Sequence, residues 1–542
     1  MSRGFFYFRR FVIVRKRLFL FPMQFLSTAK ILTGREGIIM SDRQLQFHHV
    51  TFRYDTSPQA VFEDISLHLN AGWTGIVGSN GAGKTTLLKL AASSLEPDDG
   101  MIQTPRRAVY CPQRTDFPPD RFDAFLAADT KTAALLKQML RVRDEWNARW
   151  ETLSHGERKR AQIAVALWQE PDLLAIDEPT NHIDTEARSI VSAALHTYEG
   201  IGLLVSHDRE LLDTLCQQCV FVEPPSITIR PGGISKGMTQ SRQEQESLKK
   251  EARIKKQAYK QLQREAIRRR QEAQQADKKR SKRHIDRHDH DAKGKIDAAR
   301  VSGKDAVAGK LLRQLDGRLR HAQQQADSIH VKKEYPTGIW LPGSCSPRDA
   351  LAEFPASCLK LGEEKELVLP RLFVQPTDRI GITGANGTGK STLIRKLLAS
   401  LTLPEERVTY IPQEISVEQS RQILTDIQRL PRQELGQIMT IISRLGSRPQ
   451  RLLDSAEPSP GELRKLLLAL GVLRSPYLII LDEPTNHMDL VSIQCLEEAL
   501  ADCPCCLMLV SHDTYLLDKL TTIRWHISQS AQSEQRCELH VT

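Results

Sequence analysis

The 542-residue sequence contains no apolar run that approaches the roughly 18 to 20 residues of a membrane-spanning helix, so no membrane domain is expected. It also lacks a disulfide framework, because the Cys216-x-x-Cys219 pair and the cluster Cys503, Cys505 and Cys506 each lie beside an apolar strand pattern. Neither group has a second ligand pair at the spacing of a zinc site. We therefore expect buried free thiols and a reducing, cytoplasmic setting, with redox or zinc chemistry as the alternative.

The charge of the chain is unevenly distributed. The net charge is +10, yet residues 242–333 alone hold 27 Lys and Arg against 13 Asp and Glu. The first 40 residues hold eight basic residues against one acidic residue, which leaves the remainder of the chain acidic. A basic insert between acidic domains indicates a polyanionic partner for the insert.

Residues 1–40 form a basic leader in which clusters such as Arg15-Lys16-Arg17 interrupt short apolar groups. These charges break up any signal-peptide core. We expect the leader not to be part of the functional protein, with functional translation starting at Met40. An Arg-rich targeting peptide or a surface amphipathic segment is the alternative.

The chain contains an internal repeat with a spacing of 305 or 306 residues. Because 542 residues exceed what a single hydrophobic core usually supports, the repeat predicts two domains of one kind. We divide the chain into the leader, a first unit over 41–235, a basic linker over 236–346 and a second unit over 347–542. The pairs that define the spacing are Lys84 and Lys390, Ser154 and Ser459, Asp177 and Asp482, and His207 and His512.

Strand patterns alternate with helical patterns in the first unit, which predicts an α/β fold with a parallel sheet between helices. A small antiparallel sheet is expected from Leu45 to Tyr54 and from Ile65 to Leu69. The other expected strands are Thr74 to Val77, Leu173 to Ile176 and Leu203 to Val205, and the expected helices are Thr85 to Ser93, Phe122 to Arg149 and Arg158 to Trp168.

A glycine-rich segment follows a strand pattern and precedes a helix in each unit. Both segments match the phosphate-loop pattern, in which backbone N–H groups wrap nucleotide phosphates at a helix N-terminus. Lys84 and Lys390 are expected to bridge phosphate oxygens, and the Thr85 and Ser391 hydroxyls to coordinate Mg²⁺. With the residue that follows each motif, the loops comprise Gly78, Ser79, Asn80, Gly81, Ala82, Gly83, Lys84, Thr85 and Thr86, and Gly384, Ala385, Asn386, Gly387, Thr388, Gly389, Lys390, Ser391 and Thr392.

A second repeated motif, Asp-Glu-Pro-Thr-Asn-His-x-Asp, follows an apolar strand pattern at Asp177 and again at Asp482. A carboxylate pair at the end of a strand can hold a magnesium-bound water and orient an attacking water. Because the motif occurs in both units at matching distances from the phosphate loops, it predicts two ATPase sites that use ATP and Mg²⁺.

The complete set of motifs resembles the ATP-binding cassette (ABC) superfamily, which implies two P-loop nucleotide-binding domains of that type. The resemblance implies that Glu178 and Glu483 are the catalytic glutamates and that Asp177 and Asp482 are the magnesium-site aspartates. It implies that His207 and His512 are the switch histidines at the γ-phosphate, and that Gln113 and Gln413 reach magnesium and the lytic water. The signature segments, which would contact ATP on the opposite cassette, are Ser154 with Gly156 and Ser459 with Gly461.

Two features depart from the family pattern. His155 and Pro460 occupy the second signature position, where the family usually has Gly, but the serine and the second glycine are retained, so binding is expected to persist. Tyr54 matches the aromatic residue that stacks on adenine, and no counterpart precedes Gly384. The second site is therefore expected to hold its base less firmly, although both composite sites are expected to be competent.

The linker contains no Gly or Pro from Gln243 to about Arg283 and is rich in Glu, Gln, Lys, Arg and Ala, which favours a long helix. Gly294 and Gly303 mark a loop, and a second helix is expected from Asp305 to about Lys333. Matching apolar stripes predict an antiparallel helical hairpin with a basic tip; a solvated charged linker is the alternative. The stripes comprise Leu248, Ile254, Ala258, Leu262, Ala266 and Ala273, and Val307, Leu311, Leu312, Leu315 and Leu319.

Two cassettes in one chain with a charged helical linker resemble the F subfamily, and the 41-residue spacing of Gln113 and Ser154 indicates its short-armed type. The resemblance implies a monomeric, ATP-hydrolysing factor that clamps on the ribosome in the ATP state. Its linker would reach rRNA and peptidyl-tRNA, in translation regulation or antibiotic ribosome protection. A DNA-associated maintenance ATPase, a transporter ATPase subunit and a regulatory module with idle sites are the alternatives.

Overall fold

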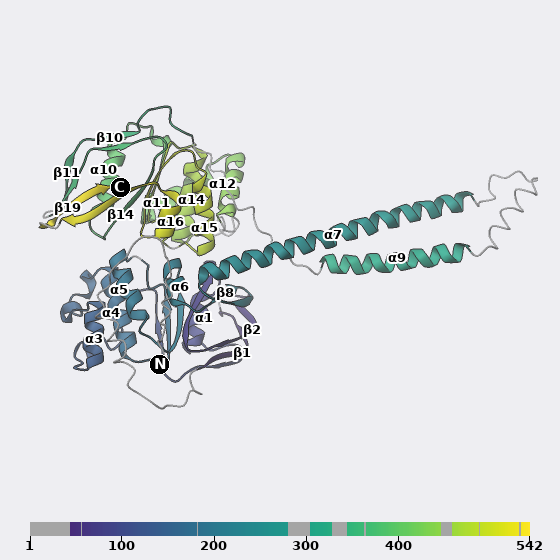
Figure 1. Cartoon of the computed structure of the whole chain (residues 1–542), viewed down its shortest axis with the longest axis horizontal. Coiled ribbons are helices and arrows are strands. Elements are labelled where there is room, and N and C mark those ends of the chain that lie inside the picture. Colours follow the sequence, from purple (N-terminus) through teal and green to yellow (C-terminus); the bar gives the residue numbers. More distant parts are fainter. Residues whose placement is uncertain are drawn as a thin grey trace, which may run out of the picture.

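The computed structural model describes residues 44–55, 57–181, 183–279, 304–327, 344–362, 365–445, 458–486, 488–530 and 533–542. Two α/β cassettes lie against each other, and a helical hairpin projects from them (Figure 1). This architecture confirms the predicted fold class. No helix in these ranges is long and apolar enough to cross a membrane. The expected leader over 1–40 and the tip loop of the hairpin over 280–303 lie outside the described residues.

The first cassette is built on a six-stranded sheet with the order β5-β6-β7-β3-β8-β9. Five strands pair in parallel and β9 closes the edge in antiparallel orientation. All five residues of β6 are buried, and alternate residues enter two different apolar clusters, as expected for a sheet covered on both faces. The strands are β3 (Gly72–Gly78), β5 (Ala108–Cys111), β6 (Leu173–Asp177), β7 (Ile201–Val205), β8 (Gln218–Glu223) and β9 (Ser226–Pro231).

A separate antiparallel sheet, β2-β1-β4, takes two strands from before the phosphate loop of the first cassette and one strand from after it. Its strands are β1 (Leu45–Phe52), β2 (Phe62–Leu69) and β4 (Asp99–Gln103). The helices of this cassette are α1 (Lys84–Ala91), α2 (Phe122–Leu126), α3 (Lys131–Leu140), α4 (His155–Trp168), α5 (Thr185–Leu195) and α6 (Arg209–Leu215).

The expected helical stretch from Phe122 to Arg149 is broken into α2, α3 and a 3₁₀ turn at Asp144–Trp146, and a second 3₁₀ turn follows at Trp150–Thr152. The Thr130 hydroxyl accepts the Ala133 N–H, so a new helix begins there. The two 3₁₀ turns bury the large side chains of Trp146 and Trp150 in the apolar cluster of the cassette. Burial of these rings explains why the helical pattern did not produce one continuous helix.

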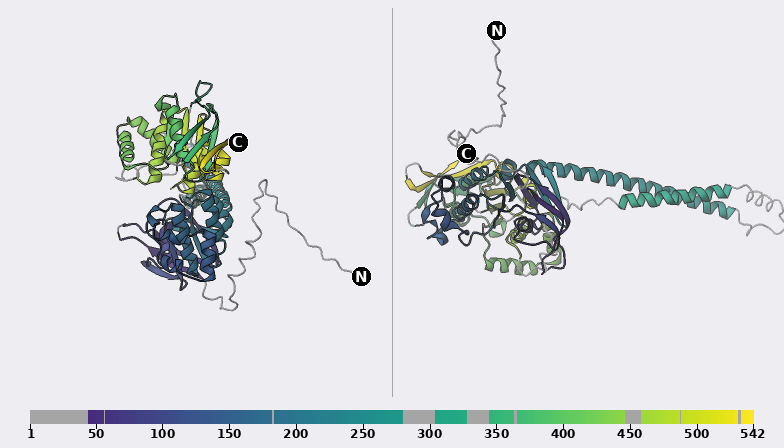
Figure 2. Two further views of the ribbon diagram at one scale, coloured as in Figure 1. Left: turned by 90° about the vertical axis from the view of Figure 1, so that its left-hand side faces the viewer. Right: turned by 90° about the horizontal axis from the view of Figure 1, so that it is seen from below.

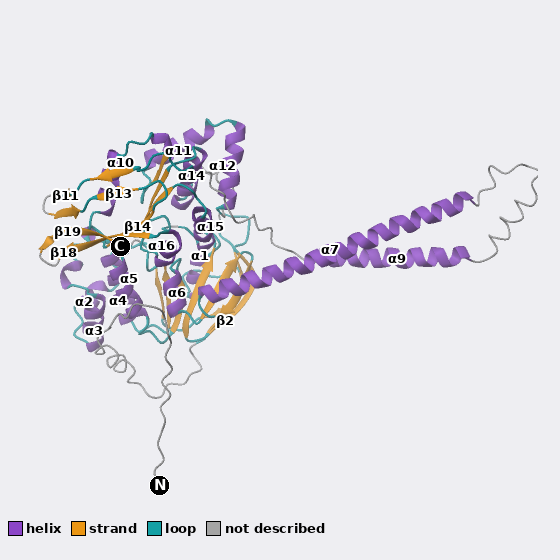
Figure 3. Ribbon diagram, turned by 45° about the horizontal axis from the view of Figure 1, so that its top comes forward, coloured by secondary structure: helices purple, strands orange, loops and turns teal. Residues whose placement is uncertain are grey.

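The second cassette repeats this plan on an eight-stranded sheet with the order β11-β12-β19-β18-β14-β17-β16-β15 and a two-stranded sheet of β10 and β13. Figure 3 shows β11, β18 and β19 at the outer edge of this cassette and α12, α14 and α15 on its other side. The strands are β10 (Ala352–Phe354), β11 (Ser357–Leu361), β12 (Lys365–Leu369), β13 (Leu372–Val374), β14 (Arg379–Gly384), β15 (Val408–Ile411), β16 (Leu478–Asp482), β17 (Cys506–Val510), β18 (Ile523–Ser530) and β19 (Ser533–Val541). The helices are α10 (Lys390–Ser400), α11 (Val417–Gln428), α12 (Arg432–Arg444), α14 (Pro460–Leu473), α15 (Leu490–Ala501) and α16 (Thr514–Leu520), with a 3₁₀ turn at Glu405–Arg407.

The linker forms two helices, α7 (Ile234–Lys279) and α9 (Lys304–Asp327), which lie side by side (Figures 1 and 2). Arg270 forms an ion pair of 2.7 Å with Asp316, and Ala266 and Leu315 are buried between the helices. The part of the predicted hairpin that the structure describes is thus present. Within the expected stripes, the side chains of Ala273, Val307, Leu311 and Leu312 lie outside the described residues.

The prediction that the first half of the apolar stripe on α7 packs against the second helix is wrong. Leu248 and Ile254 are 43% and 65% exposed, and Ala258 is also exposed. The reason is length: α7 has 46 residues, whereas α9 has 24 and pairs with the distal part of α7.

The base of α7 contacts both cassettes. Ile234, at its first turn, is buried in the apolar cluster of the first cassette. Further along the helix, the Gln494 amide of α15 donates to Met238 Sδ at 3.5 Å, and Arg242 lies 3.9 Å from Glu498 of α15. The projecting hairpin therefore begins where the two cassettes meet.

Candidate active sites

A glycine at the end of each phosphate loop lets the chain turn directly into a helix. Gly83 and Gly389 have φ values of 94° and 100°, in the left-handed region that favours glycine. A Cβ on Gly83 would lie 2.6 Å from Val61, and one on Gly389 would lie 2.7 Å from Leu361. Both loops therefore need glycine, and both bring backbone N–H groups to the N-terminus of the following helix.

The phosphate-loop lysines lie inside their own loops. Lys84 Nζ donates to the carbonyl oxygens of the first two loop residues at 3.0 and 3.2 Å, and Lys390 Nζ does so at 2.7 and 3.0 Å. Burial lowers the pKa of both lysines, although nearby carboxylates oppose the shift. Each ammonium group is thus held at the centre of a cradle where a phosphate can replace the carbonyl contacts.

A hydroxyl and a carboxylate meet beside each cradle. Thr85 Oγ1 donates to Asp177 Oδ2 at 2.7 Å, and Ser391 Oγ donates to Asp482 Oδ2 at 3.2 Å. The Tyr110 hydroxyl adds a longer contact of 3.4 Å to Asp177. Mg²⁺ binds oxygen ligands such as hydroxyls and carboxylates, so the residues present at both places fit a magnesium ion, which they would hold beside the phosphate loop.

The next residue, a glutamate, has an unusual backbone in both cassettes. Glu178 and Glu483 have φ values of 47° and 48°, which are rare for residues other than glycine and cluster at functional sites. Each glutamate faces a histidine that follows the neighbouring strand. His207 Nε2 lies 3.2 Å from Glu178 Oε1, and His512 Nε2 lies 3.6 Å from Glu483 Oε1.

Burial governs the protonation of these groups. It raises the pKa of Glu178 and of Glu483 to about 8, against the opposing effect of the lysine in the same site. Burial and the charge of Lys390 lower the pKa of His512 to about 4, so its imidazole is neutral at pH 7. In the nucleotide-free chain, both glutamates therefore hold a proton near neutral pH.

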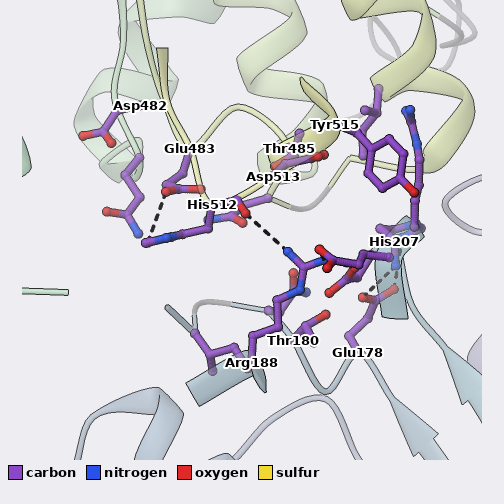
Figure 4. Close-up of a pocket in the computed structure, with 18 of the residues that line it drawn as sticks. Glu178, Thr180, Arg188, His207, Asp482, Glu483, Thr485, His512, Asp513 and Tyr515 are labelled. Atoms are coloured by element: carbon purple, nitrogen blue, oxygen red, sulfur yellow. Dashed lines mark hydrogen bonds and ion pairs between the residues drawn. The ribbon is translucent and has the colours of Figure 1, made fainter. Parts of the chain in front are cut away.

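The two carboxylate–histidine pairs line one small pocket of about 90 Å³ between the cassettes (Figure 4). Its walls include Glu178 and His207 from the first cassette and Glu483 and His512 from the second. The pocket has room for water but not for a nucleotide. It connects the two sites across the interface.

Both signature serines begin a helix. Ser154 and Ser459 each accept the backbone N–H of the glutamate three residues later, at 3.3 and 3.4 Å, and donate to its carboxylate at 2.8 Å. This capping box fixes the start of α4 and of α14. The departures at the second signature position occupy the first helical residue, where proline is well tolerated. The helices start with His155 and Gly156, and with Pro460 and Gly461.

The signature segment of the first cassette faces the phosphate loop of the second. A cavity of about 1080 Å³ lies between them. Ser154 and Gly156 line it from one cassette, and Lys390, Ser391 and Gln413 line it from the other. Its volume is sufficient for a nucleotide, and the N-terminus of α4 directs partial positive charge towards it.

Two aspartates that the sequence analysis left without a role join the cassettes. The Asn80 N–H of the first phosphate loop donates to Asp489 Oδ2 at 3.0 Å. In the reverse direction, the Asn386 N–H donates to Asp184 Oδ2 at 3.3 Å. Both aspartates end the repeated Asp-Glu-Pro-Thr-Asn-His-x-Asp motif, so their repetition was the available signal for a role at the interface.

Buried cations on the signature helices hold the glutamine loops, and no sequence pattern indicated this role. Lys159 Nζ donates to the carbonyl oxygens of Gln113 and Asp177, both at 3.4 Å. At the equivalent position of the second cassette, Arg464 donates to the Gln413 carbonyl. Each cation therefore connects a signature helix to the glutamine loop of its own site.

The residues beside the two phosphate loops differ on the side where the sequence analysis expects the base of ATP. The Tyr54 ring is 38% exposed beside the first phosphate loop, and its hydroxyl is 2.9 Å from Thr86 Oγ1. In the second cassette, Leu359, Lys360 and Leu361 of β11 line the corresponding side of the large cavity. These side chains offer aliphatic and cationic contacts where the first site offers an aromatic face.

Comparison with known proteins agrees with this geometry. The family model described as "ABC transporter" matches residues 62–181 and 370–486. Ribosome protection protein VmlR of Bacillus subtilis is 28% identical over 89% of this chain and 86% of its own. Tylosin resistance ATP-binding protein TlrC of Streptomyces fradiae is 29% identical, with 91% and 99% covered, and energy-dependent translational throttle protein EttA of Haemophilus influenzae is 27% identical, with 85% and 88% covered. The crystal structure of an archaeal ribosome recycling factor with a ribosomal stalk protein shares the fold, with a TM-score of 0.57, 18% identity and coverage of 91% and 89%.

Proposed function

We propose that this chain, a twin-cassette ATPase of the ABC superfamily and its F subfamily, clamps on the ribosome in its ATP state and leaves it after hydrolysis. The names of VmlR and EttA refer to ribosome protection and to translational throttling, and these activities support the same class of partner here. The proposal includes action in the cytoplasm as a monomer.

In this proposal each site is composite. The phosphate loop and its lysine bind the phosphates of ATP, and the Ser154 or Ser459 segment of the opposite cassette completes the site when the cassettes close. Mg²⁺, held by the hydroxyl–carboxylate pair, supplies charge neutralisation at the β- and γ-phosphates when bound. Glu178 and Glu483 orient the attacking water, with Gln113 and Gln413 beside it, and His207 and His512 contact the γ-phosphate.

The observation that carries the ribosome proposal is the position of the hairpin. The basic linker starts in the core of the first cassette and contacts α15 of the second, so closure of the cassettes moves its base. Residues 242–333 hold 27 basic against 13 acidic residues. Such a projection suits the phosphates of rRNA and of peptidyl-tRNA, which it would contact with little sequence preference.

Co-sedimentation with ribosomes tests the proposal. A Glu178→Gln, Glu483→Gln variant keeps the shape of both sites and should remain closed in ATP. We expect it to sediment with intact ribosomes in ATP and not without nucleotide, and the bound fraction should fall steeply between 50 and 200 mM salt. A second variant keeps both glutamates and lacks residues 280–303. It should still bind and hydrolyse ATP but should act weakly on translation.

The second candidate is a DNA-associated ATPase, favoured only by the basic charge of the linker. It would be supported if the double glutamine variant bound duplex DNA in ATP and failed to sediment with ribosomes. The ribosome proposal would then be withdrawn.

A further inference from the structure

The histidine of the second site is held by the first cassette. Thr185 Oγ1 lies 3.2 Å from His512 Nδ1, and Arg188 Nη1 donates to the His512 carbonyl oxygen at 3.3 Å. Figure 4 shows Arg188 reaching across the interface to His512. Both Thr185 and Arg188 belong to α5, which follows the carboxylate motif of the first cassette. Side chains of one cassette therefore fix the ring and the backbone of a site residue in the other.

The repeat does not place the same residue types at the two corresponding positions of the second cassette. At a spacing of 305 residues, Leu490 and Ile493 stand where the first cassette has Thr185 and Arg188. Leu490 is buried in the apolar cluster of the first cassette, and Ile493 is also buried. Aliphatic side chains neither donate nor accept hydrogen bonds, so these two positions cannot orient a histidine in the same way.

Arg188 is itself held in place. Its Nη2 forms ion pairs with Asp208 and with Glu210, the latter at 3.2 Å, and its side chain is mostly buried. On the same interface, Arg209 of the first cassette lies 2.8 Å from the buried Glu497 of the second. The repeat places uncharged hydroxyl side chains at the two positions that correspond to Arg209 and Glu497. The Arg209–Glu497 ion pair, like the contacts of Thr185 and Arg188 with His512, therefore has no equivalent at the positions related by the repeat.

We propose that Thr185 and Arg188 are positioning residues for the second ATPase site, which they make dependent on the first cassette through contacts that Leu490 and Ile493 cannot provide in the opposite direction. The physical argument concerns the imidazole. A hydrogen bond at Nδ1 fixes the orientation of the ring and aims Nε2, which lies 3.4 Å from Lys390 Nζ and 3.4 Å from Asn386 Oδ1, at the phosphate loop. The inference rests on the proposed ATPase mechanism. It adds that Thr185 and Arg188 of one cassette orient His512 in the other.

Single-turnover phosphate release in the full-length chain tests the proposal. In a Glu178→Gln chain, only the second site hydrolyses ATP. There we expect Thr185→Val to slow phosphate release about tenfold, the effect of losing one orienting hydrogen bond, while the Kd of a fluorescent ATP analogue stays within twofold. Thr185→Ser keeps the hydroxyl and should restore the rate to within twofold of its parent. Thr425→Val, which removes a hydroxyl bonded only within α11, should have no effect.

The reciprocal background separates positioning from general packing. In a Glu483→Gln chain, where only the first site hydrolyses ATP, Thr185→Val should leave the rate within twofold of its parent. Equal losses in both backgrounds, an unaffected rate in the Glu178→Gln chain, or failure of Thr185→Ser to restore the rate would each overturn the proposal. An unmodified chain without any ATP turnover would instead refute the proposed function as well.

A spectroscopic measurement tests the proposal even if one glutamine substitution abolishes ATP hydrolysis at both sites. In the nucleotide-free chain labelled with ¹⁵N-histidine, the His512 ring nitrogens should shift in Thr185→Val and keep their positions in Thr185→Ser. His512→Gln assigns the signals. Unchanged His512 signals in Thr185→Val would overturn the proposal.

Discussion

The buried glutamate of the first site makes the stability of the nucleotide-free chain fall as the pH rises. Burial raises the pKa of Glu178 from 4.5 to about 8, and its side chain is almost completely shielded from solvent. Between these two pH values the folded chain holds a proton that the unfolded chain has released. Folding therefore becomes less favourable with rising pH, by about 1.4 kcal/mol per pH unit for one such carboxyl.

The substitution Glu178→Gln removes this cost because an amide does not ionise. It also retains an oxygen that can accept the His207 N–H, which lies 3.3 Å from the native carboxylate. From pH 5.5 to 7.5 we expect the variant to gain about 2 to 3 kcal/mol relative to the native chain. For a domain of this size, about 1 kcal/mol shifts Tm by about 2 to 4 °C, so the difference in Tm should grow by about 5 to 10 °C.

Thermal unfolding followed by circular dichroism, in EDTA and without nucleotide, measures this difference at several pH values. Glu246→Gln is the matched control, because its side chain is exposed on α7. A difference in Tm between Glu178→Gln and the native chain that does not change with pH would refute the reasoning. So would a native chain that gains stability over the same range relative to the variant.

Three further predictions follow from single contacts. Lys159→Ala should lower the free energy of unfolding by about 2 to 4 kcal/mol in urea because buried carbonyls lose their donor, whereas Lys159→Arg, the residue type used by the second cassette, should recover most of it. Leu315→Ala should cost about 2 to 3 kcal/mol of local stability, seen as faster hydrogen exchange over 304–327 with unchanged exchange in the cassettes. In a Lys390→Ala chain, Tyr54→Ala should weaken ATP binding at least fivefold, since a stacked base contributes about 1 to 3 kcal/mol; an unchanged Kd would contradict the assignment of Tyr54.

The elements that sequence reasoning predicted are those encoded by local patterns. Each phosphate loop is specified by glycines whose φ values are positive, and each carboxylate strand by an uninterrupted apolar run. The departures at His155 and Pro460 are also explained locally, because both residues take the first position of a helix that a capping box already fixes. For such features, neighbouring residues supply most of the structural information.

The features that the sequence did not predict depend on segments far apart in the chain. Asp184 acts on Asn386, 202 residues away, and Asp489 on Asn80, 409 residues away. The residues around each aspartate show no periodic pattern that would indicate a contact with the other cassette. The stripe on α7 failed for a related reason, since an apolar residue such as Ile254 packs only where a partner helix reaches it.

The two sites are more alike in their catalytic residues than in the interface contacts that position those residues. Glu178 and Glu483 share the same backbone conformation and nearly the same environment, which argues that both sites use one mechanism. The residues that differ between the sites, such as Thr185 against Leu490, lie on the interface or beside the base, where they change the contacts of site residues and leave the two glutamates alike. Because the hairpin base contacts both cassettes, a difference in the order of hydrolysis would reach the hairpin as a sequence of movements. In the proposed function, unequal contacts across the interface would let the two similar sites hydrolyse ATP in a fixed order.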